Sequence, residues 1–243
     1  TMMNSGLINK TYIVEHFYNG KKSKFVLQNL SNIFESREAV NINHKLITDD
    51  INTKINDKSF YSDSKRWEVP NLIKCKSNNS YGLTFESGFW RAMDYIDKSF
   101  SLDYLVDESM AFQTGIGLAK FHLICSDLNY SILNTNIRNF HDTRFYIDKF
   151  ILNLINYDFK KYENKVKTRI KYLINSLSNH IRFVNNLLLD LNKIGISKNV
   201  IHGDPKLSNF LFDTKYKYVV SLIDLDTVSS GYLLTDLADC IRS

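Results

Sequence analysis

One stretch near the end of the chain, residues 199–226, constrains the fold more than any other part of the sequence. It contains a loop in which four polar residues follow the pattern His-x-Asp-x-Lys-x-x-Asn: His202, Asp204, Lys206 and Asn209. Two short apolar runs follow, at residues 210–212 and 219–223, and they predict a β-hairpin. The hairpin ends at Asp224, so the fold must return this acidic residue to the neighbourhood of the loop.

This set of side chains is what phosphoryl transfer requires of a protein. The reaction needs one carboxylate near the acceptor hydroxyl and oxygen ligands that hold Mg²⁺ on the phosphates of ATP. Asp204 is the candidate catalytic base, and Asn209 and Asp224 are the candidate Mg²⁺ ligands. Acidic groups this close would repel each other without a cation, so the pattern predicts bound Mg²⁺. Asp226 is expected either to reach a second metal ion or to support the loop.

Two other residues of the loop have different expected roles. Lys206 is a candidate catalytic residue, because its ammonium could neutralise charge that develops on the transferred phosphoryl group. His202 is expected to hold the loop backbone rather than to take part in the chemistry. The alternative, a polar acidic turn before a hairpin with no catalytic role, stays open for the loop taken alone.

The first third of the chain is predicted to be rich in strands. Apolar runs at residues 12–15 and 24–28 flank a Tyr-Asn-Gly-Lys-Lys segment that is typical of a hairpin turn. Ser36 is placed to cap a helix over residues 37–51. A meander is expected to follow, with strands at residues 72–75, 81–85 and 89–93.

From Asp94 onward the apolar residues take helical spacing. Helices are predicted over residues 107–126, 143–155, 164–194 and from about 234. The apolar stripe of the longest helix indicates ordinary helix packing, with a coiled-coil partner as the alternative. We therefore expect an α+β chain, with a small β-rich nucleotide-binding lobe at 1–93 and a larger helical lobe at 94–243 that carries the catalytic loop and the metal-binding hairpin. A small ligand would bind between the lobes.

Composition limits the class of protein. The 243 residues are 44% hydrophobic and 23% charged, which is typical of a folded protein with a sizeable core. The formal charge of +5 is spread along the chain, and neither a nucleic acid nor a membrane is expected as a partner. Three widely spaced cysteines suggest buried thiols in a reducing compartment, so a cytoplasmic location is expected. The abrupt start at Thr1 and the stop at Ser243 inside a predicted helix indicate a fragment.

Other motifs are weaker. The sequence has neither a Walker A motif nor Gly-x-Gly-x-x-Gly. Gly115 and Gly117 lie in a helical pattern, where glycine more often permits close packing than phosphate binding. Ser208 has no paired histidine and acid that would make it a nucleophile.

Taken together, the segments resemble those of the aminoglycoside/choline kinase-like phosphotransferases, and within that family those of the N-acetylhexosamine kinases. Residues 6–12 (Gly-Leu-Ile-Asn-Lys-Thr-Tyr) are similar to the opening of that branch, and residues 137–143 (Ile-Arg-Asn-Phe-His-Asp-Thr) resemble its Pro-Asn-Phe-His-Asp-Thr segment. The strand at 25–30 and the blocks 202–210 and 223–228 complete the resemblance. It implies a bilobal protein-kinase-like fold and an ATP-dependent kinase acting on the anomeric hydroxyl of an amino sugar.

The resemblance also implies roles in nucleotide binding. Asp94, Tyr95 and Ile96 would form the hinge whose backbone binds adenine. Gln28 stands where a kinase-fold lysine would contact the α- and β-phosphates, so a salt bridge to a helix glutamate such as Glu38 cannot form. The hexosamine branch resembles this chain in that respect. Residues 5–7 would be a reduced glycine loop.

The acceptor is the least defined part of the prediction. His141 and Asp142 are the candidate substrate residues, with loop anchoring as their alternative role. An amino sugar such as an N-acetylhexosamine is the expected substrate, and an aminoglycoside or choline is the alternative. Gln28 also keeps open an inactive, nucleotide-binding module, and a helical protein-interaction domain is a third hypothesis. The sequence predicts neither the oligomeric state nor the nucleotide preference.

Overall fold

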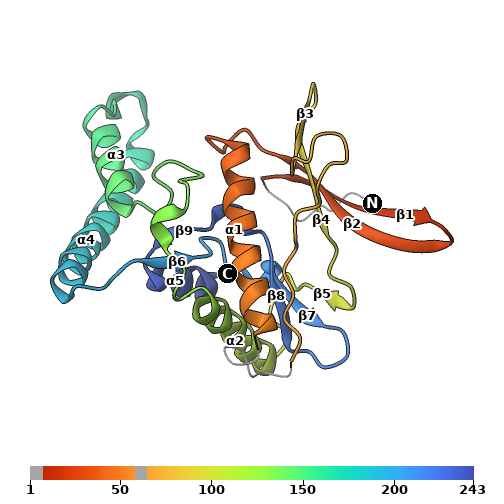
Figure 1. Cartoon of the computed structure of the whole chain (residues 1–243). Coiled ribbons are helices and arrows are strands. Elements are labelled where there is room, and N and C mark those ends of the chain that lie inside the picture. The colour runs from red at the N-terminus through yellow and green to blue at the C-terminus, as the bar shows by residue number, and fades with distance from the viewer. Residues whose placement is uncertain (1–7, 58–64) are drawn as a thin grey trace. The chain divides into compact units, whose positions relative to one another are not determined.

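A computed structural model describes residues 8–57 and 65–243 of the chain. The chain forms two compact units: Thr1–Arg138 with Lys198–Ser243, and Asn139–Ser197. Each unit is described by itself. The β-rich first third and the candidate catalytic loop both belong to the first unit (Figure 1).

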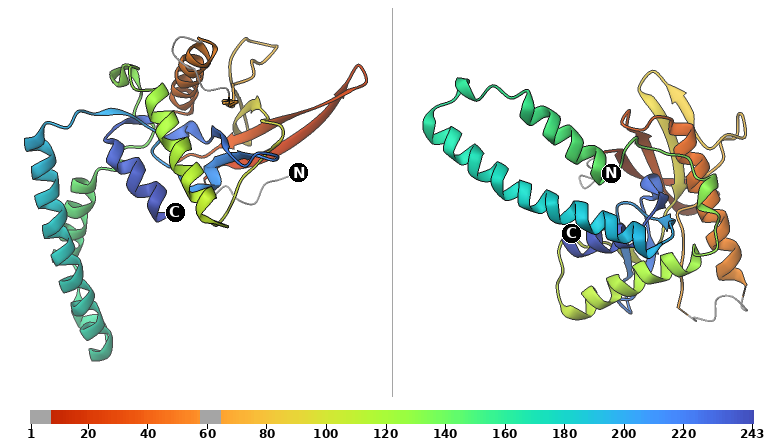
Figure 2. Two further views of the ribbon diagram at one scale, coloured as in Figure 1. Left: turned by 90° about the horizontal axis from the view of Figure 1, so that it is seen from below. Right: turned by 90° about the vertical axis from the view of Figure 1, so that its left-hand side faces the viewer.

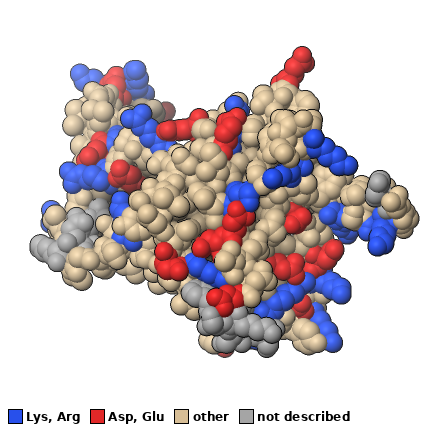
Figure 3. All heavy atoms as spheres, viewed as in Figure 1, with Lys and Arg blue, Asp and Glu red and all other residues tan. Residues whose placement is uncertain are grey.

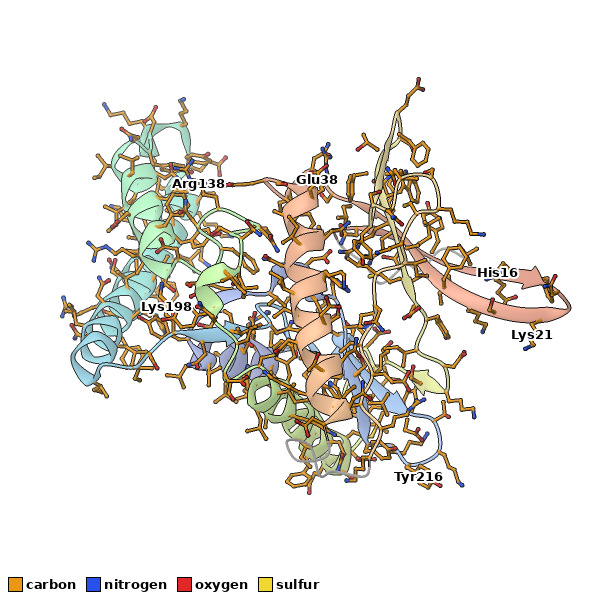
Figure 4. The ribbon with its side chains drawn as sticks, viewed as in Figure 1. His16, Lys21, Glu38, Arg138, Lys198 and Tyr216 are labelled. Atoms are coloured by element: carbon orange, nitrogen blue, oxygen red, sulfur yellow. The ribbon has the colours of Figure 1, made fainter. Side chains whose placement is uncertain are left out.

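The first unit begins with a four-stranded antiparallel sheet in the order β1-β2-β4-β3 (Figure 1). Its strands are β1 (Lys10–Tyr18), β2 (Lys21–Leu30), β3 (Leu83–Phe85) and β4 (Gly88–Asp94). Asn19 and Gly20 join β1 to β2 with φ angles of 50° and 73°, the left-handed values that a two-residue hairpin turn requires. The predicted hairpin is confirmed, and its tip between His16 and Lys21 projects from the sheet (Figure 4).

α1 (Arg37–Asn56) packs against this sheet. Ser36 begins the helix as predicted, because its Oγ accepts a hydrogen bond from the backbone N of Ala39 at 3.1 Å. A cluster of buried apolar side chains joins helix to sheet: Leu30, Phe34, Val40 and Phe89. The helix continues past the predicted end at residue 51. Its last turn is held by Lys54, whose Nζ donates to the backbone O of Ile124 at 2.7 Å.

The rest of the first unit combines helices with two small sheets. Its helices and strands are β5 (Ser99–Phe100), α2 (Glu108–Ile124), β6 (Asn199–Ile201), β7 (Phe210–Asp213), β8 (Val219–Leu222), β9 (Ser229–Gly231) and α5 (Leu233–Arg242), with short 3-10 turns η1 (Tyr130–Ile132), η3 (Leu207–Asn209) and η4 (Leu225–Thr227). β5, β7 and β8 form one antiparallel sheet, and β6 pairs with β9. α2 approaches β8 at Gly117, where a Cβ would lie 2.8 Å from the side chain of Val219. Close packing is therefore the role of this glycine.

Two differences from the predicted strands have physical causes. The predicted strand at residues 72–75 is wrong, since Leu72 forms only an isolated bridge with Met93. The chain turns instead, because Cys75 donates its backbone N–H to the backbone O of Ser80 at 2.8 Å. β5, β6 and β9 are not predicted from the sequence, because two or three residues are too few to show a repeat of period two.

The second unit is a helical hairpin of α3 (Thr143–Ile155) and α4 (Asn164–Ile194), with the short turn η2 (Phe159–Lys161) between them (Figure 2). Both helices have the predicted bounds. Asp142 begins α3 by accepting a hydrogen bond from the backbone N of Phe145 at 3.0 Å, and Gly195 ends α4 with φ of 70°. Leu173 on the apolar stripe of α4 is 51% exposed, so packing leaves part of this stripe uncovered.

Three further properties concern the surface and the thiols. No helix in the described part of the chain is long and apolar enough to cross a membrane. All three cysteines are unpaired, with Cys125 buried and Cys75 and Cys240 partly exposed, so the expectation of a buried thiol holds for one of them. Basic and acidic side chains are interspersed over the face drawn in Figure 3.

His44 on α1 predicts how stability depends on pH. It is buried, its Nε2 donates to the backbone O of Pro70 at 2.6 Å, and its Nδ1 has no hydrogen-bond partner among the described residues. Burial, and then the charge of Arg91, lower its pKa from 6.5 to about 4. Between these two pKa values, His44 is protonated in the unfolded chain and neutral in the folded chain. Between pH 6.5 and about 4, the free energy of unfolding should therefore fall by up to about 1.4 kcal/mol for each pH unit.

We expect the His44→Gln variant to lose this share of the pH dependence, while its amide keeps the bond to Pro70. Urea unfolding at pH 7 and pH 5 measures the difference. His16→Gln is the control, because His16 is exposed on β1. If His44→Gln keeps the wild-type slope, His44 does not stay neutral in the folded protein.

Candidate active site

The candidate catalytic loop lies between β6 and β7. The side chain of Asp204 is 24% exposed, so solvent reaches it. Lys206 donates a hydrogen bond to Oδ2 of Asp204. Asn209 donates through Nδ2 to the backbone O of Asp204 at 2.7 Å, and to Oδ2 at 3.4 Å. The structure therefore brings together the three polar residues that the spacing singles out.

The β7–β8 hairpin carries Asp224 to the same place. The backbone N of Ile223 donates to the backbone O of Asn209 at 2.9 Å, so the residue before Asp224 is paired with the end of the loop. Asp224 has φ of 65° and ψ of 54°, a left-handed conformation that is uncommon for a residue with a side chain. Burial, and then the negative charge of Asp226, raise the pKa of Asp224 to about 7, and Asp204 contributes in the same direction.

The oxygen atoms at this place fit a divalent metal ion. Asn209 donates through its amide nitrogen, which leaves its side-chain oxygen as a ligand. Within residues 8–57 and 65–243, no hydrogen bond reaches the carboxylate of Asp224. A carboxylate with no donor and an amide oxygen are both hard oxygen ligands of the kind that Mg²⁺ prefers. Asn209 and Asp224 therefore suit the role predicted for them.

His202 connects the catalytic loop to the end of the β7–β8 hairpin. It is fully buried, and its Nε2 donates to the backbone O of Ile223 at 2.9 Å. Its Nδ1 then serves as acceptor for the backbone N of Asp204 at 3.3 Å. Burial lowers the pKa of His202, which favours the neutral ring that this pattern requires. These contacts support the expected structural role.

Asp236 on α5, which the sequence analysis does not single out, holds the same loop. Its carboxylate accepts hydrogen bonds from the backbone N of His202 at 2.7 Å, from the backbone N of Gly203 at 2.8 Å and from Nε2 of His122 at 2.7 Å. Burial opposes its ionisation, but the bonds from His122 and the two amides hold its pKa below the usual value. The only sequence signal is an acidic residue within an amphipathic helix.

Gly203 is required by this arrangement. Its φ is 83°, in the left-handed region that favours glycine. A Cβ at this position would lie 2.6 Å from the backbone O of Thr227. A side chain at position 203 would therefore disturb the loop whose Gly203 amide donates to Asp236.

Asp226 lies two residues after Asp224 and is buried. Arg91 donates to its Oδ1, and Asn9 donates to its Oδ2 at 2.7 Å. Arg91 also donates twice to Oε1 of Gln28, at 2.7 and 3.1 Å. Gln28 therefore lies beside a buried cation, and both oxygens of Asp226 have protein partners. The role of Arg91 is not predicted from the sequence, although Arg91 shares the buried face of β4 with Phe89 and Met93.

The three predicted hinge residues follow β4. Asp94, Tyr95 and Ile96 contribute to one cavity of about 290 Å³, which Lys24 and Asn71 also line. The backbone N of Asp94 donates to the backbone O of Asn71 at 2.9 Å, and its side chain accepts from Asn71 at 3.1 Å. The end of β4 is thus fixed on one side by Asn71.

The remaining predicted residues lie elsewhere. His141 and Asp142 belong to the second unit, where Asp142 is the cap of α3. Glu38 lies in the first turn of α1 (Figure 4), where it accepts from Oγ of Ser36 at 3.3 Å. Asn41, one turn later, accepts from Arg91 at 3.2 Å. The proposed glycine loop at residues 5–7 lies outside the described residues.

The contacts of Asp236 predict that the Asp236→Asn variant is less stable than the wild type. An asparagine supplies one acceptor oxygen where the carboxylate serves three donors, and at least one buried N–H is left unpaired. We expect the free energy of unfolding to fall by about 2–4 kcal/mol. Asp239→Asn on the same helix is the control, because Asp239 pairs with Arg242, whose side chain is 72% exposed. Equal stability of the two variants in urea would contradict the role assigned to Asp236.

Known structures with the same fold are phosphotransferases and kinases. An aminoglycoside phosphotransferase from Alicyclobacillus acidocaldarius matches with a TM-score of 0.63 at 14% identity, over 94% of this chain and 66% of that chain. The ethanolamine kinase of Plasmodium vivax matches with 0.54 at 16% identity, over 99% and 59%. A spectinomycin phosphotransferase, solved with ADP and spectinomycin, matches with 0.56 at 13% identity, over 98% and 66%. These likenesses confirm the predicted kinase-like α+β fold.

The chain spans about three-fifths to two-thirds of the length of these structures. The sequence model of the phosphotransferase enzyme family matches residues 67–243, which is well over half of the chain. The matched region includes the catalytic loop and the hairpin that carries Asp224. The chain therefore belongs to the phosphotransferase enzyme family.

Proposed function

We propose that this protein transfers the γ-phosphoryl group of ATP to a hydroxyl of a small molecule, in a Mg²⁺-dependent reaction. The observation that carries the proposal is the convergence of Asp204, Asn209 and Asp224, with hydrogen bonds that leave the Asn209 oxygen and the Asp224 carboxylate available. Membership of the phosphotransferase enzyme family supports the reaction class.

In the proposed reaction, Asp204 is the catalytic base. Its carboxylate accepts a hydrogen bond from the acceptor hydroxyl and orients the oxygen toward the γ-phosphorus. The new bond joins that oxygen to phosphorus, the bond from phosphorus to the bridging oxygen of ADP breaks, and the hydroxyl proton passes to Asp204. Lys206, which donates a hydrogen bond to Asp204, would neutralise charge that develops on the phosphoryl group.

Bound Mg²⁺ would neutralise the phosphates of ATP and orient the γ-phosphoryl group. Asn209 and Asp224 would hold it. For Asp226 we favour support of the loop over a second metal ion, because both of its oxygens have donors. We propose that the hinge backbone at Asp94, Tyr95 and Ile96 binds adenine, so that residues 1–93 form the nucleotide-binding lobe and 94–243 the catalytic lobe.

For the acceptor, we propose an amino sugar such as an N-acetylhexosamine. Support comes from the sequence segments of this chain that resemble those of the N-acetylhexosamine kinases, including residues 137–143. His141 and Asp142 remain the candidate acceptor residues, although Asp142 also has the structural role of capping α3. ATP as donor fits a cytoplasmic location.

The Asp204→Asn variant tests the role of the catalytic base. Asparagine keeps the shape of the side chain but cannot take up the proton, so we expect kcat for ATP-dependent phosphorylation to fall by about 10²- to 10⁴-fold. ATP·Mg²⁺ binding should change little. Asp103→Asn is the control, because Asp103 is exposed outside the site. A fully active Asp204→Asn variant would rule out this mechanism.

A panel of N-acetylhexosamines, aminoglycosides and choline identifies the acceptor. Turnover of N-acetylhexosamines alone would support the amino-sugar proposal, whereas turnover of aminoglycosides or choline would replace it. ATP·Mg²⁺-dependent thermal stabilisation without turnover of any hydroxyl compound would indicate an inactive nucleotide-binding module. Failure to bind ATP·Mg²⁺ would remove the proposed function altogether.

A further inference from the structure

A buried ion pair links the N-terminal sheet to the metal-binding turn. Arg91 on β4 and Asp226 in η4 have side chains only 1% and 3% exposed. They are separated by 135 residues in the sequence. Burying a charge is unfavourable unless it is paired and fully hydrogen-bonded, and removal of one partner leaves an uncompensated charge. The pair therefore joins the two elements strongly.

The guanidinium of Arg91 is oriented by neutral side chains around it. β2 and β4 pair in a register that places Gln28 directly opposite Arg91. Gln28 accepts two of the hydrogen bonds of Arg91, and Asn41 on α1 accepts a third at 3.2 Å. The amide nitrogen of Gln28 donates to Oγ1 of Thr11 at 3.0 Å, which fixes the direction in which its oxygen points. One arginine thus connects the sheet, α1 and η4.

This arrangement accounts for glutamine at position 28. A lysine there would place a second cation against a buried guanidinium, and it would remove the oxygen that accepts two hydrogen bonds from Arg91. A glutamine offers an acceptor oxygen and no charge. The positive charge on the buried face of the sheet therefore comes from Arg91 on β4, and the neutral Gln28 lies opposite it on β2.

The ion pair also acts on Asp224. Asp226 is two residues further along the chain, and its backbone O accepts a hydrogen bond from Asn136 at 2.7 Å. Asp224 itself is in the left-handed region, which is unfavourable for a residue with a side chain and persists only where neighbouring contacts hold it. With both its side chain and its backbone held, Asp226 fixes the turn in which Asp224 presents its carboxylate.

We propose that Arg91, oriented by Gln28, is a positioning residue for the metal site and acts through Asp226 on the metal ligand Asp224. The inference rests on the proposed function. In this proposal Gln28 orients Arg91, and Arg91 connects the sheet to the metal-binding turn through Asp226. A lysine at position 28 would not orient Arg91 in this way.

The test measures metal binding separately from turnover. Mn²⁺ binding in the presence of ADP is titrated by electron paramagnetic resonance for wild type and for Arg91→Met, which removes the charge and keeps the length. We expect Arg91→Met to weaken Mn²⁺·ADP binding by about 10- to 100-fold, as for other residues that orient a metal ligand. Metal-free ADP should bind as in wild type. Arg91→Lys should recover part of the loss, because it restores the charge but not the forked hydrogen bonds.

The Gln28→Lys variant tests an alternative explanation. In that alternative, Gln28 only replaces the lysine that would contact the phosphates in a kinase fold, and restoring the lysine would improve binding. We expect the single variant to bind Mn²⁺·ADP more weakly, and Gln28→Lys combined with Arg91→Met to bind more tightly than either single variant. Arg37→Met, on the partly exposed first turn of α1, is the control. Gln28→Met covers the case in which Arg91→Met fails to fold. It keeps the ion pair, and we expect a smaller loss in the same direction.

The outcomes distinguish the two proposals. If folded Arg91→Met binds Mn²⁺ with wild-type affinity, the inference is overturned and the kinase proposal stays intact. If Arg91→Met does not fold, wild-type affinity in Gln28→Met has the same meaning. Tighter binding or faster turnover in Gln28→Lys overturns it as well. If wild type binds no Mn²⁺·ADP, both proposals fall.

Discussion

The carboxylate of Asp236 determines the shape of the loop on which the proposed chemistry depends. It accepts hydrogen bonds from two consecutive backbone amides, those of His202 and Gly203, inside the protein. Consecutive amides can converge on one carboxylate only where the backbone turns sharply, and Gly203 supplies that turn with its positive φ. Once this loop is fixed, the short turn η3 brings Asn209 within hydrogen-bond distance of Asp204.

The three aspartates around this loop differ in how their charge is compensated. Asp236 has three donors, and Asp226 has Arg91 and Asn9. Asp224 has no hydrogen-bond donor within the described residues, and burial raises its pKa to about 7. A buried charge without compensation is unfavourable, so it persists where a ligand supplies the missing charge. The contrast among these carboxylates therefore separates Asp224, the proposed metal ligand, from Asp226 and Asp236, whose carboxylates are held by protein donors.

Much of the fold could be predicted because its signals are local. α3 and α4 have the predicted bounds, since their apolar repeats, the Asp142 cap of α3 and Gly195 after α4 are local signals. The convergence of Asp204, Asn209 and Asp224 was predictable from spacing, because they lie within 21 residues of one another, from 204 to 224. Short β6 and β9 were not predictable, because they exist only through pairing with each other. Arg91 was missed for the same reason, since its partner Asp226 is 135 residues away.

The amino-acid sequence by itself determined the helices, the hairpins and the identity of the acidic and amide groups near the end of the chain, because periodicity, turn residues and close spacing are properties of neighbouring residues. Only the tertiary structure decided which carboxylates are compensated and which is not. That distinction depends on donors from β4 and α2. The charge state and orientation of a buried side chain follow from partners brought together by folding, and no local pattern in the sequence specifies them.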